Sequence, residues 1–187
     1  MGEIQMKKED KKMEKLCSFY VSDWHLATMI LPYISHKIEE NAKIVTILEK
    51  DMEEHIRTLV EKLNLKNQNN ILNISWTSIN GKKYSDIEKK LESLQTHGEN
   101  VILINGCQNY MEVQNQNIEK WFKKANVQSI KIINLFEVTE FNNHIMDILD
   151  AHDKVLNTSG EKEIEEVFEG YHKGEKVETK KVVGANE

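Results

Sequence analysis

The sequence has few cysteines and no long apolar segment. Only two of its 187 residues are cysteines, Cys17 and Cys107, and both lie in or beside short apolar runs that we predict to be strands. Two such residues do not form a disulfide framework, so we expect reduced thiols. We find neither the pattern of a secretory leader nor an apolar run of membrane-spanning length. These absences exclude a disulfide-rich secreted scaffold and predict a cytoplasmic protein without a membrane partner.

Positive charge is also in short supply. The sequence contains 25 Lys and Arg residues against 31 Asp and Glu residues, which gives a net charge of −6. This balance disfavours broad binding to nucleic acids or anionic membranes. Residues 120–124, Lys-Trp-Phe-Lys-Lys, mix basic and aromatic side chains as nucleic-acid binders do. We interpret them instead as the end of an amphipathic helix, where lysines complement the helix dipole.

The spacing of apolar residues alternates between the periods of strands and helices. Short β-branched and apolar runs predict five strands, at residues 16–21, 43–49, 71–76, 100–105 and 130–135. Apolar positions three or four apart predict helices at residues 24–41, 52–63, 85–95, 111–125 and 140–156. Helices between strands imply right-handed crossovers. The predicted fold class is therefore α/β, with a doubly wound, mainly parallel sheet of five or more strands and helices on both faces.

Composition predicts one domain with charged ends. A chain of this length in which 39% of residues are hydrophobic can bury one good core. Residues 1–15 are charged and lack an apolar period, so we predict a flexible leader. Residues 16–156 form the α/β domain, and residues 157–187 are predicted to form a short helix at 161–170 and a mobile charged tail.

The turn after the first predicted strand does not have the composition of a phosphate-binding loop. Residues 22–26 read Ser-Asp-Trp-His-Leu and contain no glycine, lysine or threonine. A phosphate loop needs glycines so that backbone N–H groups can approach the anion, a lysine for charge and a Ser or Thr hydroxyl for magnesium. This turn offers an aspartate, a tryptophan and a histidine in their place.

Two segments carry a resemblance to a known family. Residues 44–56, Ile-Val-Thr-Ile-Leu-Glu-Lys-Asp-Met-Glu-Glu-His-Ile, resemble the RecA/KaiC-type ATPase core, in which a strand ends in glutamates and a helix follows. Residues 19–22, Phe-Tyr-Val-Ser, with the helix-forming residues 26–38, are similar to the MEDS domain, a RecA-like module of bacterial sensory and regulatory proteins that lacks a working phosphate loop. The resemblance covers about residues 17–135 and implies a RecA-like core.

The chain departs from the active members of this family in the parts that phosphoryl transfer needs. Glu49 matches the first of two glutamates with which KaiC-like ATPases activate water, but Lys50 replaces the second. Asn105, followed by Gly106, stands where the family's Walker B aspartate would hold magnesium, and an amide lacks the charge of a carboxylate. Because the phosphate loop is missing too, we expect no ATP hydrolysis and assign no catalytic residue, metal or cofactor.

The carboxyl ends of the predicted strands form the candidate ligand site. In open α/β sheets, ligands bind beyond these ends. Aromatic, charged and hydrogen-bonding residues gather there: Ser22, Asp23, Trp24, His25, Glu49, Lys50, Trp76, Asn105 and Gln108. They suit a small planar or anionic ligand, with Trp24 or Trp76 as a stacking wall. The alternative is that the tryptophans close the core and the polar groups cap helices.

Two further groups of residues carry weaker chemical signals. Asp23 with His25 suggests acid–base chemistry and Cys107 suggests a nucleophile, but no base can be placed beside Cys107, which we interpret as a buried, inert thiol. Residues 144–153 contain histidines and aspartates, which are metal-ligand types. A closed metal site needs convergent ligands, so we interpret this run as the solvated acidic face of a helix.

From these observations we expect a non-catalytic sensory or regulatory module of degenerate RecA/KaiC-like type, which binds a small ligand or a protein partner. The first alternative is a ligand-free interaction protein that pairs with an active RecA-like ATPase. The second is a small cytoplasmic enzyme that uses Asp23, His25 or Cys107. The resemblance also allows a homo-oligomer, because RecA-like modules pair edge to edge.

Overall fold

The computed structural model of the chain describes residues 10–81, 83–139 and 144–173. Three sequence predictions fall wholly or partly outside these residues. They are the leader, of which residues 1–9 lie outside, the start of the helix predicted at 140–156, and the tail from residue 174 onward.

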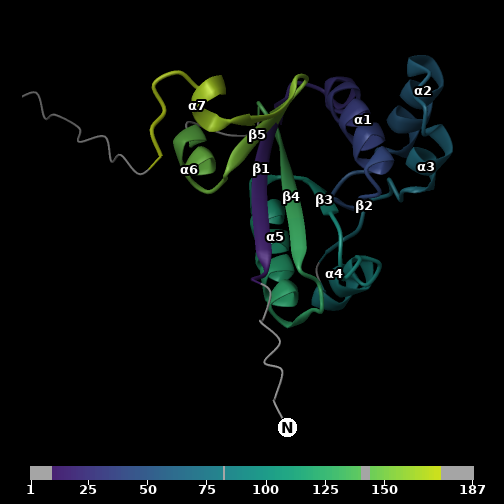
Figure 1. The fold of residues 1–187 in the computed structure, drawn as a ribbon. Coiled ribbons are helices and arrows are strands. Elements are labelled where there is room, and N and C mark those ends of the chain that lie inside the picture. Colours follow the sequence, from purple (N-terminus) through teal and green to yellow (C-terminus); the bar gives the residue numbers. More distant parts are fainter. Residues whose placement is uncertain (1–9, 82, 140–143, 174–187) are drawn as a thin grey trace, which may run out of the picture.

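A six-stranded sheet forms the centre of the fold (Figure 1), and its strands follow the order β2-β3-β4-β1-β5-β6. The strands are β1 (Lys12–Tyr20), β2 (Lys43–Leu48), β3 (Asn100–Asn105), β4 (Ser129–Glu137), β5 (Lys154–Asn157) and β6 (Gly160–Glu163). Strands β1 to β5 pair in parallel, and β6 runs antiparallel to β5. The predicted α/β class and the mainly parallel sheet of five or more strands are confirmed.

Helices cover both faces of the sheet because its central strands are apolar on both sides. Along β3, Val101 and Leu103 pack into one hydrophobic core, while Ile102 and Ile104 pack into a second. The first core is completed by α1 (Asp23–Glu39), α2 (Glu53–Leu63) and α3 (Gln68–Asn73). The second is completed by α4 (Tyr84–Leu91), α5 (Gln108–Lys124), α6 (Ile145–Asp150) and α7 (Ile164–Val167). In the described part of the chain, no helix is both long and apolar enough to span a membrane.

The strand predicted at residues 71–76 is wrong. Residues Gln68–Asn73 form α3, and the chain continues from there as a loop. Ile71 is fully buried in the first core, and the indole Nε1–H of Trp76 donates a hydrogen bond to the Ile71 carbonyl at 2.9 Å. A short apolar run fits a buried strand and a buried helical turn equally well, so its pattern could not separate the two. Without this strand, β2 is the edge of the sheet and pairs only with β3.

The predicted C-terminal helices are wrong in extent. Helix α6 ends at Asp150, and β5 then pairs in parallel with β1. The helix predicted at 161–170 is reduced to α7, because residues 160–163 form β6. Gly160, at φ +100°, permits the tight turn between β5 and β6. At the other end of the domain, β1 begins at Lys12 rather than at residue 16, because it pairs with β4 from Ser129 onward.

A partly buried network of charges lies at the amino-terminal ends of the strands. The Lys131 Nζ lies 2.6 Å from Glu161 Oε1 and 3.2 Å from Glu99 Oε1, and Lys37 Nζ reaches the same Glu99 oxygen at 3.0 Å. The Tyr33 hydroxyl donates to Glu161 at 2.8 Å. Burial by itself raises the pKa of Glu161, but the hydrogen bonds from Lys131 and Tyr33 outweigh it and hold the pKa below its ordinary value. The network joins β4, α1 and β6.

Candidate functional site

The strand order brings Glu49 and Asn105 together at the carboxyl edge of the sheet. Glu49 directly follows β2 and Asn105 ends the neighbouring β3, and the Glu49 N–H donates to the Asn105 carbonyl at 2.8 Å. The residues that the family resemblance singles out are thus adjacent, as expected where parallel strands end.

The carboxylate of Glu49 sits at the start of α5. Its Oε2 accepts a hydrogen bond from the Cys107 backbone N–H at 2.6 Å, and its Oε1 lies 3.6 Å from the Cys107 thiol. Gly106 makes this approach possible, because a Cβ there would lie 2.7 Å from Glu49 Oε2 and 2.9 Å from Glu49 Cβ. A negative group is favourable at a helix N-terminus. The Glu49 carboxylate is therefore an anion of the protein itself at the N-terminus of α5, where a negative charge is favourable.

The side chain of Asn105 is buried, and its amide nitrogen donates two hydrogen bonds. Its exposed fraction is 3%, and its Nδ2 donates to the Tyr20 hydroxyl at 2.7 Å and to the Leu135 carbonyl at 3.1 Å. These bonds tie the end of β3 to β4 and β1. The Asn105 amide therefore has a structural role.

The first turn of the fold caps its own helix. Ser22 Oγ accepts from the His25 N–H at 3.2 Å, and the His25 ring accepts from the Val21 N–H through Nδ1 at 3.1 Å. Asp23 lies in the first turn of α1, where its charge complements the helix dipole. Trp24 is 47% exposed and packs edge-on against His55, with 4.7 Å between the ring centroids.

The remaining predicted residues are not gathered into one site. Trp76 is buried in the first core, so its ring closes the core as the alternative interpretation predicts. Lys50 is exposed next to Glu49. Gln108 contacts Glu112 one helical turn away, at 3.3 Å. Trp24 is thus the predicted tryptophan that remains accessible at this edge.

A cavity of about 540 Å³ adjoins the carboxylate of Glu49. Its walls include Asn80, Gly81, Cys107, Tyr110 and Gln114. The Tyr110 hydroxyl donates to the Ile79 carbonyl at 3.0 Å, and burial, aided by the charge of Glu49, raises its pKa to about 12. The phenol is therefore protonated near neutral pH and can act only in its neutral form.

Sequence reasoning missed Asn80, Gly81 and Tyr110. The first two belong to the loop before α4. This loop has no periodic pattern of apolar residues from which its path could be predicted. Gly81 has φ +60°, and a Cβ there would lie 2.5 Å from Gln114 Nε2. An isolated glycine between polar residues was the one available signal, and it marks a turn rather than a ligand site.

The two cysteines differ in environment. Both are free, as predicted. Cys17 is buried, and its burial raises the pKa of the thiol to about 12, which makes it unreactive at neutral pH. The prediction of a buried Cys107 is wrong, since this residue is exposed at the start of α5. The group within reach of its thiol is the Glu49 carboxylate.

The residues near α6 form no metal site. Across the described ranges, no three His, Cys, Asp or Glu side chains converge as metal ligands. His144, which directly precedes α6, and Asp147 on α6 are exposed, and His144 Nδ1 lies 3.3 Å from Asp147 Oδ2, which agrees with a solvated face. His152 differs from this interpretation because it is buried, with an exposed fraction of 5%. Its Nδ1 lies 2.5 Å from the Ile148 carbonyl, and its Nε2 lies 2.9 Å from the Asn134 amide nitrogen.

His152 is expected to make stability depend on pH. Burial lowers its pKa in the folded state, so below about pH 6.5 the unfolded chain binds a proton that the folded chain does not. The free energy of unfolding should therefore fall as the pH drops below this value, by up to about 1.4 kcal/mol per pH unit. Urea unfolding between about pH 7.5 and 5.5, which spans the ordinary histidine pKa, measures the slope. His152→Gln should flatten the slope of the free energy of unfolding against pH, whereas His144→Gln, at an exposed position, should leave it unchanged. Equal slopes in the wild type and both variants would contradict this role of His152.

In comparisons with known proteins, no family model matches the chain, and no curated protein or solved structure matches it significantly. A functional interpretation therefore depends on the geometry of the carboxyl edge itself. At that edge lie the Glu49 carboxylate, which contacts the start of α5, the accessible Trp24 and the cavity beside Tyr110.

Proposed function

We propose that the chain is a non-catalytic sensory or regulatory module of degenerate RecA/KaiC-like type, which binds a small ligand or a protein partner at the carboxyl edge of its sheet. The observation that carries this proposal is the contact of Glu49 with the Cys107 N–H at 2.6 Å. In phosphate-binding α/β proteins, N–H groups at such a helix start are open to the anion. Here a carboxylate of the protein occupies one of them and repels a phosphate.

The other groups of this edge support the same proposal. Asn105 donates both of its amide hydrogens within the fold, and the Ser22 hydroxyl caps α1. Each would have to leave its partner before it could hold a phosphate or its magnesium ion. Since phosphoryl transfer depends on positioned cations and donors, this arrangement favours binding without hydrolysis.

Exposed apolar side chains beside the edge favour a binding role. Val21, Trp24 and Val138 are 63%, 47% and 43% exposed. The Val138 N–H donates to the Tyr20 carbonyl at 2.8 Å, so Val138 lies next to the turn that holds Val21 and Trp24. Grouped apolar side chains on a surface mark interaction sites. The cavity beside Glu49 also falls in the size range of small-molecule sites.

A thermal-shift titration tests the proposal. The panel contains magnesium-ATP, ADP, cyclic dinucleotides and common metabolites, because a ligand that binds only the folded state raises the melting temperature by mass action. We expect a saturable shift with a ligand that does not depend on magnesium, and its loss in Trp24→Ala. Leu72→Ala, which removes an exposed leucine of α3, is the matched control and should keep the shift. A magnesium-dependent shift with ATP that disappears in Glu49→Gln would contradict the proposal.

The second candidate is an interaction protein that pairs with an active RecA-like ATPase and binds no small ligand. The exposed group of Val21, Trp24 and Val138 favours it, because apolar side chains of this kind suit a protein surface as well as a ligand. No thermal shift across the panel, together with a purified complex that Trp24→Ala disrupts, would select this candidate.

A further inference from the structure

The outer edge of β2 presents main-chain groups without partners. Lys43 N–H donates to Glu99 and Glu49 N–H donates to Asn105, so the odd-numbered residues of this strand face β3. Main-chain groups alternate in direction along a strand, and those of Ile44, Thr46 and Leu48 therefore point outward. The Leu48 carbonyl accepts from the Ile79 N–H at 2.8 Å. Among the described residues, nothing pairs with the outward N–H and C=O groups of Ile44 and Thr46.

These unpaired groups are recessed rather than fully exposed. Ile44 and Thr46 have exposed fractions of 8% and 2%. Buried main-chain donors and acceptors are nearly always paired, because an unpaired one loses its hydrogen bonds to water. A groove of about 360 Å³ runs beside them and gives access to them. The edge is thus open to a partner that supplies hydrogen bonds in the plane of the sheet.

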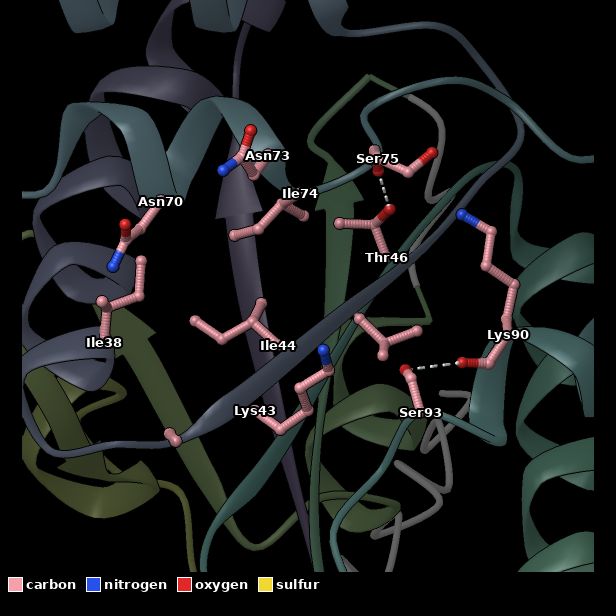
Figure 2. A pocket seen from close by; sticks show the side chains of 12 residues that line it. Ile38, Lys43, Ile44, Thr46, Asn70, Asn73, Ile74, Ser75, Lys90 and Ser93 are labelled. Atoms are coloured by element: carbon pink, nitrogen blue, oxygen red, sulfur yellow. Dashed lines mark hydrogen bonds between the residues drawn. The ribbon is translucent and has the colours of Figure 1, made fainter.

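The two walls of the groove differ in chemistry (Figure 2). On the side of the first core, the groove is lined by Ile38, Ile74 and the amides of Asn70 and Asn73. On the side of α4, it is lined by Lys43, Lys90 and Ser93. One wall is therefore apolar with two amides, and the other is cationic.

The two lysines of the groove have no acidic partner among the described residues. The ion pairs of the described chain involve other lysines, such as Lys37 and Lys131, and neither Lys43 nor Lys90. Burial without a neighbouring carboxylate lowers the pKa of Lys90. A carboxylate in the groove would stabilise the charged form of the partly buried Lys90. The two lysines therefore favour an acidic ligand.

We propose that the groove along β2 binds a short extended peptide of a partner protein, which adds a strand to the sheet and alternates acidic with apolar side chains. The peptide main chain pairs with Ile44 and Thr46. Because side chains of a strand alternate between the two faces, carboxylates on one face meet Lys43 and Lys90, and apolar side chains on the other meet Ile38 and Ile74. This site is separate from the carboxyl edge and does not depend on the function proposed for it.

A second copy of the chain fits the groove less well than a free peptide. The edge strand lies recessed between α3 and α4. A strand that is part of another folded domain would bring that domain against both walls of the groove. The β2 of a second copy would also bring its own Lys43 and Lys90 to the same edge. Like charges at a strand edge oppose such pairing.

Fluorescence anisotropy with labelled peptides tests the proposal on the whole chain. We expect saturable binding of a peptide of three Glu-Val repeats, and binding weaker by at least about tenfold for three Lys-Val repeats. Methylation of alternate peptide nitrogens in the Glu-Val peptide should also weaken it at least about tenfold, because it removes the strand hydrogen bonds. Equal binding of the three peptides, or none, would overturn the proposal.

Variants and hydrogen exchange locate the binding. Lys43→Glu combined with Lys90→Glu should weaken the Glu-Val peptide by at least about tenfold. Lys12→Glu combined with Lys62→Glu makes the same change of charge outside the groove and should leave affinity within about twofold; melting curves confirm that both variants fold. In the unmodified protein, bound peptide should slow amide exchange at Ile44 and Thr46, but not at Val45, which already pairs with β3. Unchanged exchange at Ile44 and Thr46, or a dimer that protects both amides without peptide, would overturn the proposal.

Discussion

Replacement of Lys131 by methionine is expected to lower the free energy of unfolding by about 3 kcal/mol. Methionine keeps much of the side-chain length but removes the charge that lies 2.6 Å from Glu161 and 3.2 Å from Glu99. The Lys131 side chain is only 13% exposed, and Glu99 keeps Lys37 as a partner, so the carboxylate left partly buried without a cation is that of Glu161. An uncompensated buried charge costs more than the pair contributes. Urea unfolding at neutral pH measures the loss.

The pH dependence of this loss separates charge from packing. The pKa of Glu161 is held below its ordinary value of 4.5 in the fold, so its contribution is present above that pH and is lost as the pH falls through the folded pKa. The difference between wild type and Lys131→Met should therefore shrink in acid. Lys12→Met, at an exposed position of β1, should change stability by less than about 0.5 kcal/mol. A loss that does not vary with pH, or an equal loss in the control, would contradict the ionic explanation.

Replacement of Gly106 by alanine is expected to cost about 1–3 kcal/mol. The new Cβ would lie 2.6 Å from Tyr110 Cδ1, 2.7 Å from Glu49 Oε2 and 2.9 Å from Glu49 Cβ. Such contacts are shorter than real Cβ atoms make, so Glu49 has to move away from the Cys107 N–H. Chemical denaturation gives the cost, and the chemical shift of the Cys107 amide reports the lost hydrogen bond.

A double-mutant cycle shows whether the cost of Gly106→Ala comes from Glu49. Glu49→Ala removes the carboxylate that the new Cβ meets, so the second substitution should cost less in that background, by about 1 kcal/mol. Additive effects would show that the Glu49 carboxylate is not the obstacle, which leaves Tyr110 and the Glu49 Cβ that alanine retains. They would also argue against a requirement for Gly106 in the approach of the Glu49 carboxylate to the Cys107 N–H.

The buried strands of this fold could be predicted because their sequences have few alternatives. The runs that form β2, β3 and β4 are β-branched and apolar on both faces, as central parallel strands require. By contrast, residues 71–76 have the same apolar character but pack against α1 and α2 as a helix and a loop. The hairpin of β5 and β6 was missed because its residues were assigned to the ends of two helices, predicted at 140–156 and 161–170. Short runs do not show which partner will bury them.

The candidate site was predictable to the extent that it depends on where strands end. Glu49 and Asn105 meet because β2 and β3 are neighbours in the sheet. The alternation of elements implied that the sheet is parallel, but it did not give the order of the strands. Trp76 was misplaced together with its false strand, and its ring lies in the core. Tyr110 and Gly81 could not be found, because the path of the loop before α4 depends on contacts across the fold. The free edge of β2 likewise became visible only once residues 71–76 were removed from the sheet.

Turnover of magnesium-ATP by the purified chain shows most directly whether the proposed module is non-catalytic. We expect phosphate release no faster than in buffer, with no change in Glu49→Gln, because Glu49 occupies the Cys107 amide and Asn105 is held by Tyr20 and Leu135. Phosphate release that exceeds buffer and is lost in Glu49→Gln would show that this carboxylate activates water, and would contradict the proposal of a non-catalytic module.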